Sequence, residues 1–586
     1  MAKVSSNEID TVLAVEVGSV NTRAALFDSV EGNYRFLASG VAPSTVAAPM
    51  LDAGEGVRIA LDRLNSISGR QFMGEEEQLI IPSSQEGAGV DRFVATLSAG
   101  EPLRVVAAGL LDDVSLESVH RLVSTINADI VDTLSLNDTR RPESQIDSIL
   151  RLRPDIIVIA GGTNNGASRS VLKMINTLNL ALSLLPDNFR PEILYAGNNN
   201  LAGNVTSLLG ELAPVSIVPN IRPDLEVENL TPAETKLIQI YRKIYGQKIL
   251  GVEELENWAN GYLLPASSGF GRVVRFLSRV YDQSKGVLGV DVGASSTTIA
   301  SAFAGKLNLS AYPGLGVGSG LTGLLQNTTL DEIVRWIPYD VSTAQVANYL
   351  YNKSIYASSL PATAEDLAIE QALAREVIRN ALNQAKASFP QDSPGPSHGG
   401  LLPWFEPIIV RGSVITNAPS LSQSLMIILD GVQPTGISRV ILDKNSLAPA
   451  LGALAGINSM LSVQVLESSA FINLGTVISP VGKAHGGVPI LRITIQYASG
   501  QENTIEIKYG ALRSIPLPAG QSAQLHLQPL HRFDVGMGGP GKSGRLRVVG
   551  GYFGIVIDAR GRPIELSASL ERRRESIVHW YRSLKA

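Results

Sequence analysis

Two stretches of this sequence place an acidic residue two positions before a glycine, at the start of a turn rich in hydroxyl and amide side chains. The first is VLAVEVGSVNTRAALFD, with Glu16 and Gly18, and the second is VLGVDVGASSTTIASAF, with Asp291 and Gly293. Each pattern predicts a β-hairpin. Backbone N–H groups and hydroxyls in such turns can bind phosphate oxygens, and a carboxylate at the strand end can hold a hydrated magnesium ion. Two such turns facing one cleft would suit a nucleoside triphosphate.

The residues predicted to bind this nucleotide are the acid, the glycine and the polar side chains of each turn. They are Glu16, Gly18, Ser19, Asn21 and Thr22 in the first hairpin, and Asp291, Gly293, Ser295, Ser296 and Thr297 in the second. Glu16 and Asp291 are also the predicted magnesium ligands.

A third stretch, FDVGMGGPGKSGRLRV, carries the letter pattern of a P-loop between Gly536 and Ser543. A P-loop requires a strand before the glycines and a helix after them. The sequence that follows, GRLRVVGGYFGIVIDARGRP, alternates apolar and polar residues and contains glycines, which predicts a β-hairpin instead. We therefore interpret the stretch as a glycine-rich loop between two strands. The Asp–Arg pair near Asp558 is expected to be exposed, where such a pair contributes about 0–1 kcal/mol.

Length and composition limit the classes of protein to consider. With 586 residues the chain exceeds a single hydrophobic core, and two to four domains are expected. The net charge of −5 gives no general attraction for nucleic acid or acidic membranes, and the absence of cysteine excludes disulfides and thiolate chemistry. The first ten residues contain no apolar signal region, and the uncharged run at 307–330 is too polar to span a bilayer. We expect a soluble, cytoplasmic protein.

The sequence between and after the hairpins shows two different organisations. Short apolar strands alternate with helical stretches between about 100 and 250, which predicts a parallel, helix-covered sheet. The polar turns AGGTNNG and AGNNN in this region fit either a small-ligand or partner site or ordinary chain reversals. A long helix is expected after Thr363, and β-patterned segments from about Ser468 predict a small barrel or sandwich closed by a C-terminal helix.

The paired hairpins resemble the two phosphate motifs of the actin-like (ASKHA) ATPase superfamily, which includes sugar kinases, heat-shock chaperones and bacterial division actins. The strand and turn PIIVRGSVITNAP resemble its adenosine loop, which adds Gly412 and Ser413 to the nucleotide-binding residues. The small-residue stretch LDKNSLAPALGALAG resembles the helix that follows. The resemblance implies an α/β, duplicated actin-like (ribonuclease H-like) ATPase fold that binds ATP and Mg²⁺.

Within this superfamily the sequence resembles the glutamate mutase-associated MutL family. The blocks that carry the resemblance are PSSQEGAGVDRFVATLSAGEPLRVVAAGL, LRPDIIVIAGGTNNG, ILYAGNNNLAGNV and ILDKNSLAPALGALA. They imply a first actin-like half at 1–285 with an α/β insertion at about 100–250, a second half at 286–465, and an additional β-rich domain at 466–586. The family implies a cytoplasmic ATP-binding accessory protein, a chaperone or reactivating factor for a cobalamin-dependent mutase.

Two departures from the superfamily pattern concern catalysis. Glu16 stands where an aspartate is usual, and Ile299 stands where relatives carry a second carboxylate after the turn. Asp291 therefore remains as the predicted catalytic residue, positioning magnesium or the attacking water. Any ATP hydrolysis is expected to be slow.

Three functions are compatible with these features. The leading hypothesis is an ATP-binding accessory factor with weak or vestigial hydrolysis that acts on a protein partner. The first alternative is a small-molecule kinase or ATP-dependent hydrolase, which requires a substrate base near the cleft. The second is an actin-like scaffold that assembles with itself and uses the β-rich domain as a contact surface.

Overall fold

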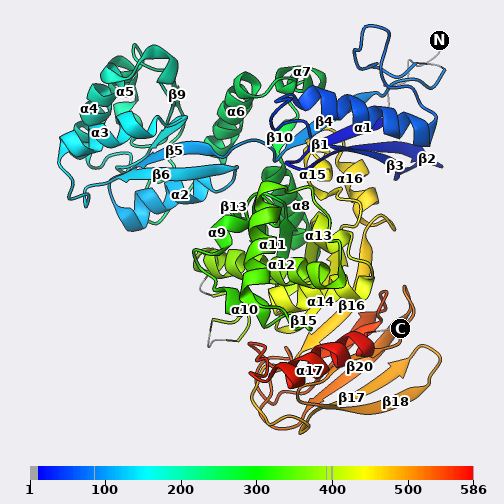
Figure 1. The fold of residues 1–586 in the computed structure, drawn as a ribbon. Helices are drawn as coiled ribbons and strands as arrows, with labels where there is room; N and C mark the ends of the chain where they lie inside the picture. The colour runs from blue at the N-terminus through cyan, green and yellow to red at the C-terminus, as the bar shows by residue number, and fades with distance from the viewer. Residues whose placement is uncertain (1–10, 85, 391, 397–399, 585–586) are drawn as a thin grey trace, which may run out of the picture.

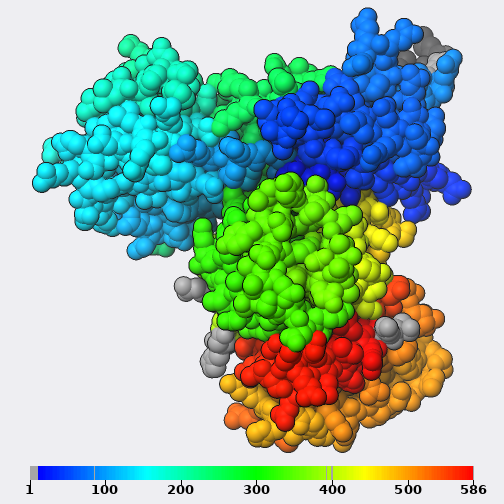
Figure 2. All heavy atoms as spheres, viewed as in Figure 1, coloured from blue at the N-terminus to red at the C-terminus, as the bar shows by residue number. Residues whose placement is uncertain are grey.

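The computed structural model describes residues 11–84, 86–390, 392–396 and 400–584. The first ten residues, on which the expected absence of a secretory signal rests, lie outside this set. Figure 1 shows a central body from which the insertion (cyan) and the C-terminal portion (orange and red) project at different ends, and Figure 2 shows both as distinct lobes. None of the helices in the described ranges combines the length and apolarity needed to cross a lipid bilayer.

The first sheet contains the first predicted hairpin. Its strands are β1 (Val12–Val17), β2 (Asn21–Val30), β3 (Asn33–Pro43), β4 (Arg92–Leu97) and β10 (Leu263–Pro265). They lie in the order β10-β4-β1-β2-β3, where β1, β2 and β3 are antiparallel neighbours and β4 and β10 run parallel to β1. Helix α1 (Ala53–Ser68) packs on β3 so closely that a Cβ on Gly40 would collide with the backbone oxygen of Ala60.

The second sheet repeats this arrangement. Its first five strands are β11 (Gly286–Val292), β12 (Ser296–Phe303), β13 (Lys306–Pro313), β14 (Phe405–Arg411) and β15 (Gly436–Leu442). They lie in the order β13-β12-β11-β14-β15, with the same strand directions as in the first sheet. The internal duplication is confirmed at the level of strand order and direction, and the chain is an α/β protein built on two copies of one sheet arrangement.

Two helices pack together where the halves meet. They are α8 (Ala266–Val280) and α15 (Ala448–Leu454). A Cβ on Gly452 would collide with the backbone oxygen of Gly269, so only glycine permits this approach. Both helices belong to a buried cluster that also contains residues of β1, β2, β11 and β12. The small residues of α15 make this close packing possible.

The other helices of the second half cover its sheet. The long helix expected after Thr363 is α12 (Ala364–Ala385), and the Thr363 side chain accepts a hydrogen bond from Asp366 N in a capping box. The remaining helices of this layer are α9 (Leu321–Leu324), α10 (Leu330–Val334), α11 (Thr343–Ile355), α13 (Ser413–Thr416) and α14 (Leu421–Val432). Helix α16 (Ser459–Leu466) is an exception, because it packs against β3 of the first sheet.

The insertion is a five-stranded parallel sheet in the order β6-β5-β7-β8-β9, as the alternating pattern predicted. Its strands are β5 (Leu103–Ala108), β6 (Ala128–Leu134), β7 (Ile156–Ile159), β8 (Glu192–Tyr195) and β9 (Val215–Ile217). Its helices are α2 (Glu117–Val123), α3 (Pro142–Leu152), α4 (Ser168–Leu184) and α5 (Ala202–Leu209), and the chain returns through α6 (Thr231–Lys248) and α7 (Val252–Ala259). The insertion also touches the second half, because Ala311 N donates to Ser124 O at 2.7 Å.

The C-terminal portion is β-rich, as expected, and shares its strands between two sheets. The strands β16 (Ile472–Ser479), β22 (Ile555–Asp558) and β19 (Leu512–Ile515) extend the second sheet beyond β15. A separate four-stranded sheet contains β18 (Glu502–Lys508), β17 (Pro489–Tyr497), β20 (Ser522–Pro529) and β21 (Gly544–Val549), and helix α17 (Leu570–Ser583) follows. One buried cluster joins residues of both sheets. The division of the chain at 285 and 465 stays a prediction.

The stretch with the P-loop letters joins two paired strands, so its interpretation as a glycine-rich loop is confirmed. It connects β20 to β21, which pair antiparallel. The hairpin predicted after it is wrong, because β21 pairs with β20 whereas β22 pairs with β16 and β19. The glycines between β21 and β22 lie where the chain passes from one sheet to the other. One of them, Gly550, packs so closely that a Cβ there would collide with the backbone oxygen of Leu517.

The expectation of an exposed ion pair at Asp558 is also wrong. Strand β22 lies between β16 and β19, and the Asp558 side chain is fully buried. Its carboxylate binds Arg560 Nε and Arg562 Nη2, each at 2.8 Å, while Arg560 Nη1 reaches Asp430 Oδ1 at 2.6 Å. Burial alone would raise the pKa of Asp558, but the two arginines hold it well below its usual range. This ion-pair cluster fastens the C-terminal portion to helix α14.

Candidate functional site

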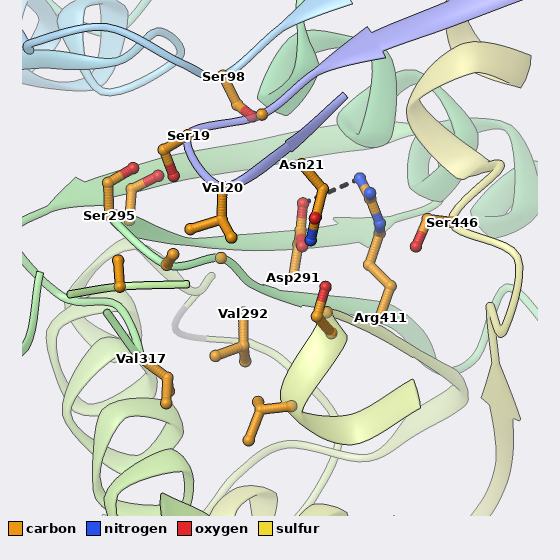
Figure 3. Close-up of a pocket in the computed structure, with 18 of the residues that line it drawn as sticks. Ser19, Val20, Asn21, Ser98, Asp291, Val292, Ser295, Val317, Arg411 and Ser446 are labelled. Carbon is orange, nitrogen blue, oxygen red and sulfur yellow. Dashed lines mark hydrogen bonds and ion pairs between the residues drawn. The ribbon is translucent and has the colours of Figure 1, made fainter. Parts of the chain in front are cut away.

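A cavity of about 500 Å³ lies between the two halves, where the turns of both hairpins meet. Its walls include the β1–β2 turn, the β11–β12 turn, the end of β14 with the start of α13, and the connection between α11 and α12. The insertion contributes Asn127. Figure 3 shows Ser19, Asn21, Ser295, Asp291 and Arg411 around this space. The volume falls within the range of about 300–1,000 Å³ that is typical of small-molecule sites.

The two turns have the same backbone geometry. Gly18 N donates to Asn21 O at 2.9 Å, and Gly293 N donates to Ser296 O at 2.9 Å. A Cβ would lie 2.9 Å from the Asn21 oxygen at Gly18 and 2.8 Å from the Ser296 oxygen at Gly293. Both positions therefore require glycine to close the turn.

The structure brings ten of the twelve predicted binding residues to the cavity wall. These are Glu16, Gly18, Ser19, Asn21, Asp291, Gly293, Ser295, Ser296, Gly412 and Ser413. The other two, Thr22 and Thr297, are fully buried beneath the turns and do not line the cavity. Each directly follows the turn, at the first position of its strand that faces the core.

An arginine links the two carboxylates. Arg411 Nη2 lies 2.7 Å from both carboxylate oxygens of Glu16, and Arg411 Nη1 lies 3.1 Å from Asp291 Oδ2. Strand pairing sets this arrangement, because Arg411 and Asp291 are direct neighbours on the parallel strands β14 and β11. Glu16 belongs to the first half, so the Glu16–Arg411 pair joins the halves across the cavity.

Two further charged residues surround this group. Asp443 is fully buried and accepts hydrogen bonds from the backbone N–H groups of Leu447 and Ala448, each at 2.8 Å, while Arg411 Nε lies 3.9 Å from its Oδ2. Arg23 stands opposite Glu16 on β2 and donates to Asn445 O at 2.6 Å, a second link between the halves.

Burial dominates the ionisation of this cluster. It raises the pKa of Asp291 to about 6; Arg411 acts in the opposite direction, and Glu16 and Asp443 add to the rise. Burial also raises the pKa of Asp443 and lowers that of Arg23. Burial would lower the pKa of Arg411 as well, but Asp291 and Glu16 outweigh it and raise that pKa. Arg411 therefore stays a cation, whereas the pKa of Asp291 lies well above that of an ordinary aspartate.

A family model described as MutL protein matches residues 12–470, which cover both hairpins, the insertion and the whole cavity. This chain belongs to the MutL family. The family expected from the sequence blocks, the glutamate mutase-associated one, is thereby confirmed.

Other comparisons show only distant similarity. No curated protein matches this MutL-family chain. The nucleotide-free structure of an acetone carboxylase is 12% identical, with a TM-score of 0.30, and the match covers 86% of this chain and 81% of that one. A nucleotide-free diol dehydratase-reactivating factor is 10% identical, with a TM-score of 0.29 and coverage of 78% and 99%. A glycerol dehydratase reactivase is 11% identical, with a TM-score of 0.29 and coverage of 76% and 99%.

The magnesium ion expected between Glu16 and Asp291 does not fit the residues of this MutL-family chain. The Arg411 guanidinium lies between the two carboxylates and binds both oxygens of Glu16. Magnesium demands oxygen ligands in near-ideal octahedral geometry and would lie beside a buried positive charge. Across the described ranges, no group of three or more His, Asp or Glu side chains is arranged to hold a metal ion. The two carboxylates act here as ion-pair partners.

The glycine-rich tract YPGLGVGSGLTGLL packs onto the second turn. Val317 N donates to Gly293 O at 2.9 Å, Gly320 N to Ala294 O at 3.0 Å, and Gly314 N to Ser295 O at 3.1 Å. Gly316 and Gly318 lie against Ala294 so closely that side chains there would collide with it. The glycines thus serve a close backbone contact.

The asparagine-rich turns of the insertion fasten its loops to one another. Asn220 Nδ2 donates to Gly162 O at 2.9 Å and to Asn164 Oδ1 at 3.1 Å, and Asn200 Nδ2 donates to Asn164 O at 2.7 Å. Asn198 Nδ2 also donates to Gly166 O at 3.4 Å. These amides are engaged within the turns, which favours the interpretation as chain reversals over a ligand site.

Sequence reasoning missed Arg411 and Asp443. Both residues stand at the ends of apolar strands, in PIIVRGS and VILDKN. A charged residue at the end of a buried strand was the sequence signal that could have identified them. The partner of Arg411 in the first half is far away in the chain, because Glu16 and Arg411 are 395 positions apart. It also missed Lys353 and Glu370, which form a pair at 3.0 Å on the wall built by α11 and α12.

Proposed function

We propose that this chain is an ATP-binding accessory protein of the MutL type, which acts on a cobalamin-dependent mutase as a chaperone or reactivating factor. The observation that carries the proposal is the cavity between the halves, with both hairpin turns in its wall. Family membership supports the same conclusion independently.

The nucleotide phosphates would contact the two turns. Ser19 and Ser295 supply hydroxyls, and glycine-containing turns present backbone N–H groups that suit phosphate oxygens. The nucleoside would extend toward Gly412 and Ser413, at the end of β14. These roles follow from the residue types on the cavity wall and from the superfamily resemblance.

Hydrolysis would be slow or absent. Asp291 is the candidate for positioning an attacking water, and its carboxylate already binds Arg411 at 3.1 Å. A general base must reach the water it activates by a hydrogen bond. A pKa of about 6 gives Asp291 suitable basicity, but the ion pair restrains the group from moving toward the nucleotide.

The links across the cavity suggest how binding would act on a partner. The halves are joined there by the Glu16–Arg411 pair and by the bond from Arg23 to Asn445. A polyanion that enters the cavity competes for both arginines and changes the balance between open and closed arrangements of the halves. A partner bound to both halves would receive that motion. Release of a damaged cobalamin from a tight interface is the kind of step that such a motion would drive.

The test combines calorimetric titration of ATP, a phosphate-release assay, and exchange of inactive cobalamin from a purified cobalamin-dependent mutase. Binding and ATP-dependent exchange with little phosphate release would support the proposal. Ser295→Phe fills the cavity wall and should abolish both binding and exchange, whereas Ser499→Phe, on an exposed turn of the C-terminal sheet, should leave both unchanged. Failure to bind ATP would contradict the proposal. Rapid phosphate release with a metabolite would favour a small-molecule enzyme, and nucleotide-dependent polymers would favour a scaffold.

A further inference from the structure

The guanidinium of Arg411 lies where the two phosphate-turn carboxylates converge. It holds both oxygens of Glu16 at 2.7 Å and one oxygen of Asp291 at 3.1 Å. One guanidinium nitrogen, Nη2, thus binds both oxygens of Glu16 while the other, Nη1, binds Asp291, and charge-assisted bonds of this kind are short and strong. A divalent ion that bound these oxygens would lie directly beside the guanidinium charge, and the repulsion between the two cations would oppose its binding.

The surrounding structure holds the arginine in place. Its backbone is fixed beside Asp291 by the pairing of β14 with β11, and the residue is 5% exposed. The next residue, Gly412, has φ +120°, and a side chain there would collide with the backbone of Val292. The end of β14 is therefore packed directly against β11. Removing a partner from a buried ion pair leaves an uncompensated charge, so displacement of Arg411 is strongly opposed.

The cluster also retains donors for an anion. Among the described residues, Arg411 Nε and Arg23 Nε are buried and have no hydrogen-bond partner, and both side chains line the cavity. A buried donor without a partner is energetically unfavourable. Phosphate oxygens that enter the cavity would meet both guanidinium groups, and a shift of either side chain toward the anion would give its Nε a partner.

We propose that this site binds nucleotide phosphates without a divalent cation, with Arg411 in the place of the metal. The inference rests on the proposed nucleotide function and specifies the form of its ligand, a metal-free nucleotide polyanion. It accounts for the presence of Glu16 where the superfamily pattern has an aspartate, because a carboxylate that pairs with an arginine need not satisfy the geometry of magnesium and its water ligands. It also gives a reason for slow hydrolysis, since phosphoryl transfer relies on a metal ion to neutralise the developing charge.

The direct test is calorimetric titration of ATP into the wild-type chain, once with excess MgCl₂ and once with EDTA. We expect dissociation constants that agree within about threefold, whereas a metal bridge to the protein would change them by about tenfold or more, equivalent to about 1.4 kcal/mol. Binding that requires magnesium would overturn this inference and leave the proposed function standing. Absence of binding in both buffers would overturn the proposed function and this inference together.

A second test uses Mn²⁺ alone, followed by electron paramagnetic resonance of the free ion. Wild type should leave the free Mn²⁺ signal unchanged, and Arg411→Gln, which releases Glu16 and Asp291, should reduce it through binding at the vacated position. The matched control is Arg375→Gln, because Arg375 is also buried and paired, with Asp430 at 2.8 Å, but lies outside the cavity wall. Mn²⁺ binding at this site by wild type would contradict the inference, and so would ATP binding by Arg411→Gln that is as strong in EDTA as wild type.

Discussion

The turns at 18–21 and 293–296 are closed by the same backbone hydrogen bond, but the residues around them differ. In the first hairpin, the acid Glu16 faces Arg23 across the strands and pairs with Arg411 of the opposite half. In the second, Asp291 faces Thr298 and pairs with Arg411 of its own half. Duplication has therefore kept the scaffold and changed the charges around it. The first hairpin links the halves, whereas the second belongs to one half.

The two turns also differ in the backbone hydrogen bonds that they receive from other segments. The second turn is held by the glycine-rich tract, which donates to the backbone oxygens of Gly293, Ala294 and Ser295. The corresponding contact of the first turn is a single bond from Ser44 N to Val20 O at 2.8 Å. One turn is thus fixed mainly by its own half, and the other depends more on ion pairs across the cavity. Substitutions at equivalent positions should separate these two modes.

The largest effects on stability are expected from substitutions of the two acids, and the first of these is Glu16→Gln. The substitution removes the bidentate partner of Arg411 and the cross-strand partner of Arg23. We expect the free energy of unfolding to fall by about 3 kcal/mol, at the lower end for a broken buried ion pair because Glu16 keeps some exposure. Urea unfolding at pH 7 measures this. Glu506→Gln, in an exposed pair with Arg492, is the control and should lose at most about 1 kcal/mol. Equal losses in both variants would contradict a role of Glu16 in joining the halves.

The equivalent substitution in the second hairpin, Asp291→Asn, should increase stability rather than reduce it. The folded-state pKa of Asp291 is about 6 and its usual value is 3.8. Between these values the folded state binds a proton that the unfolded state does not, so the contribution of Asp291 to stability falls as pH rises through this window. At pH 7 the ionised carboxylate destabilises the fold, and Asn should raise the free energy of unfolding by about 3 kcal/mol. Urea unfolding from pH 4 to 7 measures the difference, which should vanish near pH 4. A difference that is independent of pH would contradict this assignment.

The turn glycines should show a smaller contrast. Alanine at either position brings Cβ to within 2.9 Å or less of a backbone oxygen, which forces the turn to shift. We expect Gly293→Ala to lose about 1.5 kcal/mol and Gly18→Ala about 1 kcal/mol, because the glycine-rich tract leaves the second turn less room to adjust. Thermal and urea unfolding measure both. Gly203→Ala is the control, since helix α5 leaves open space around Gly203, and it should be neutral or stabilising. A larger loss at Gly18 would reverse the comparison.

The hairpins and their duplication could be predicted because they are local patterns. A strand, an acid-x-Gly step and a polar turn occupy consecutive residues, and the same letters occur twice. Eight of the ten binding residues predicted in the hairpins reach the cavity for the same reason, since a turn that points into a cleft carries its neighbours with it. Thr22 and Thr297 do not, because side chains alternate between the two faces of a strand, and their positions face the core.

The charge pairing could not be predicted because its partners are distant in sequence. Arg411 meets Asp291 across 120 residues and Glu16 across 395. The same limit explains the error at Asp558. The alternating pattern after Lys542 predicts strands but does not specify the sheet that each strand joins, and β22 enters the interior of the second sheet while β21 remains with β20. Burial of Asp558 and its arginines follows from that choice of partner.

The smallest expected effect concerns Thr22 and Thr297, where the two hairpins should behave alike. Both side chains are fully buried, and neither hydroxyl has a hydrogen-bond partner among the described residues. Replacing an unsatisfied buried hydroxyl by a methyl group of similar shape removes a desolvated polar atom. Thr22→Val and Thr297→Val should therefore change the free energy of unfolding by less than about 1 kcal/mol, in the stabilising direction. ATP affinity, measured by calorimetry, should be unchanged in both, since neither residue lines the cavity. Weaker ATP binding in only one variant would mean that its turn rearranges around the ligand, and the two hairpins would then differ in motion as well as in charge.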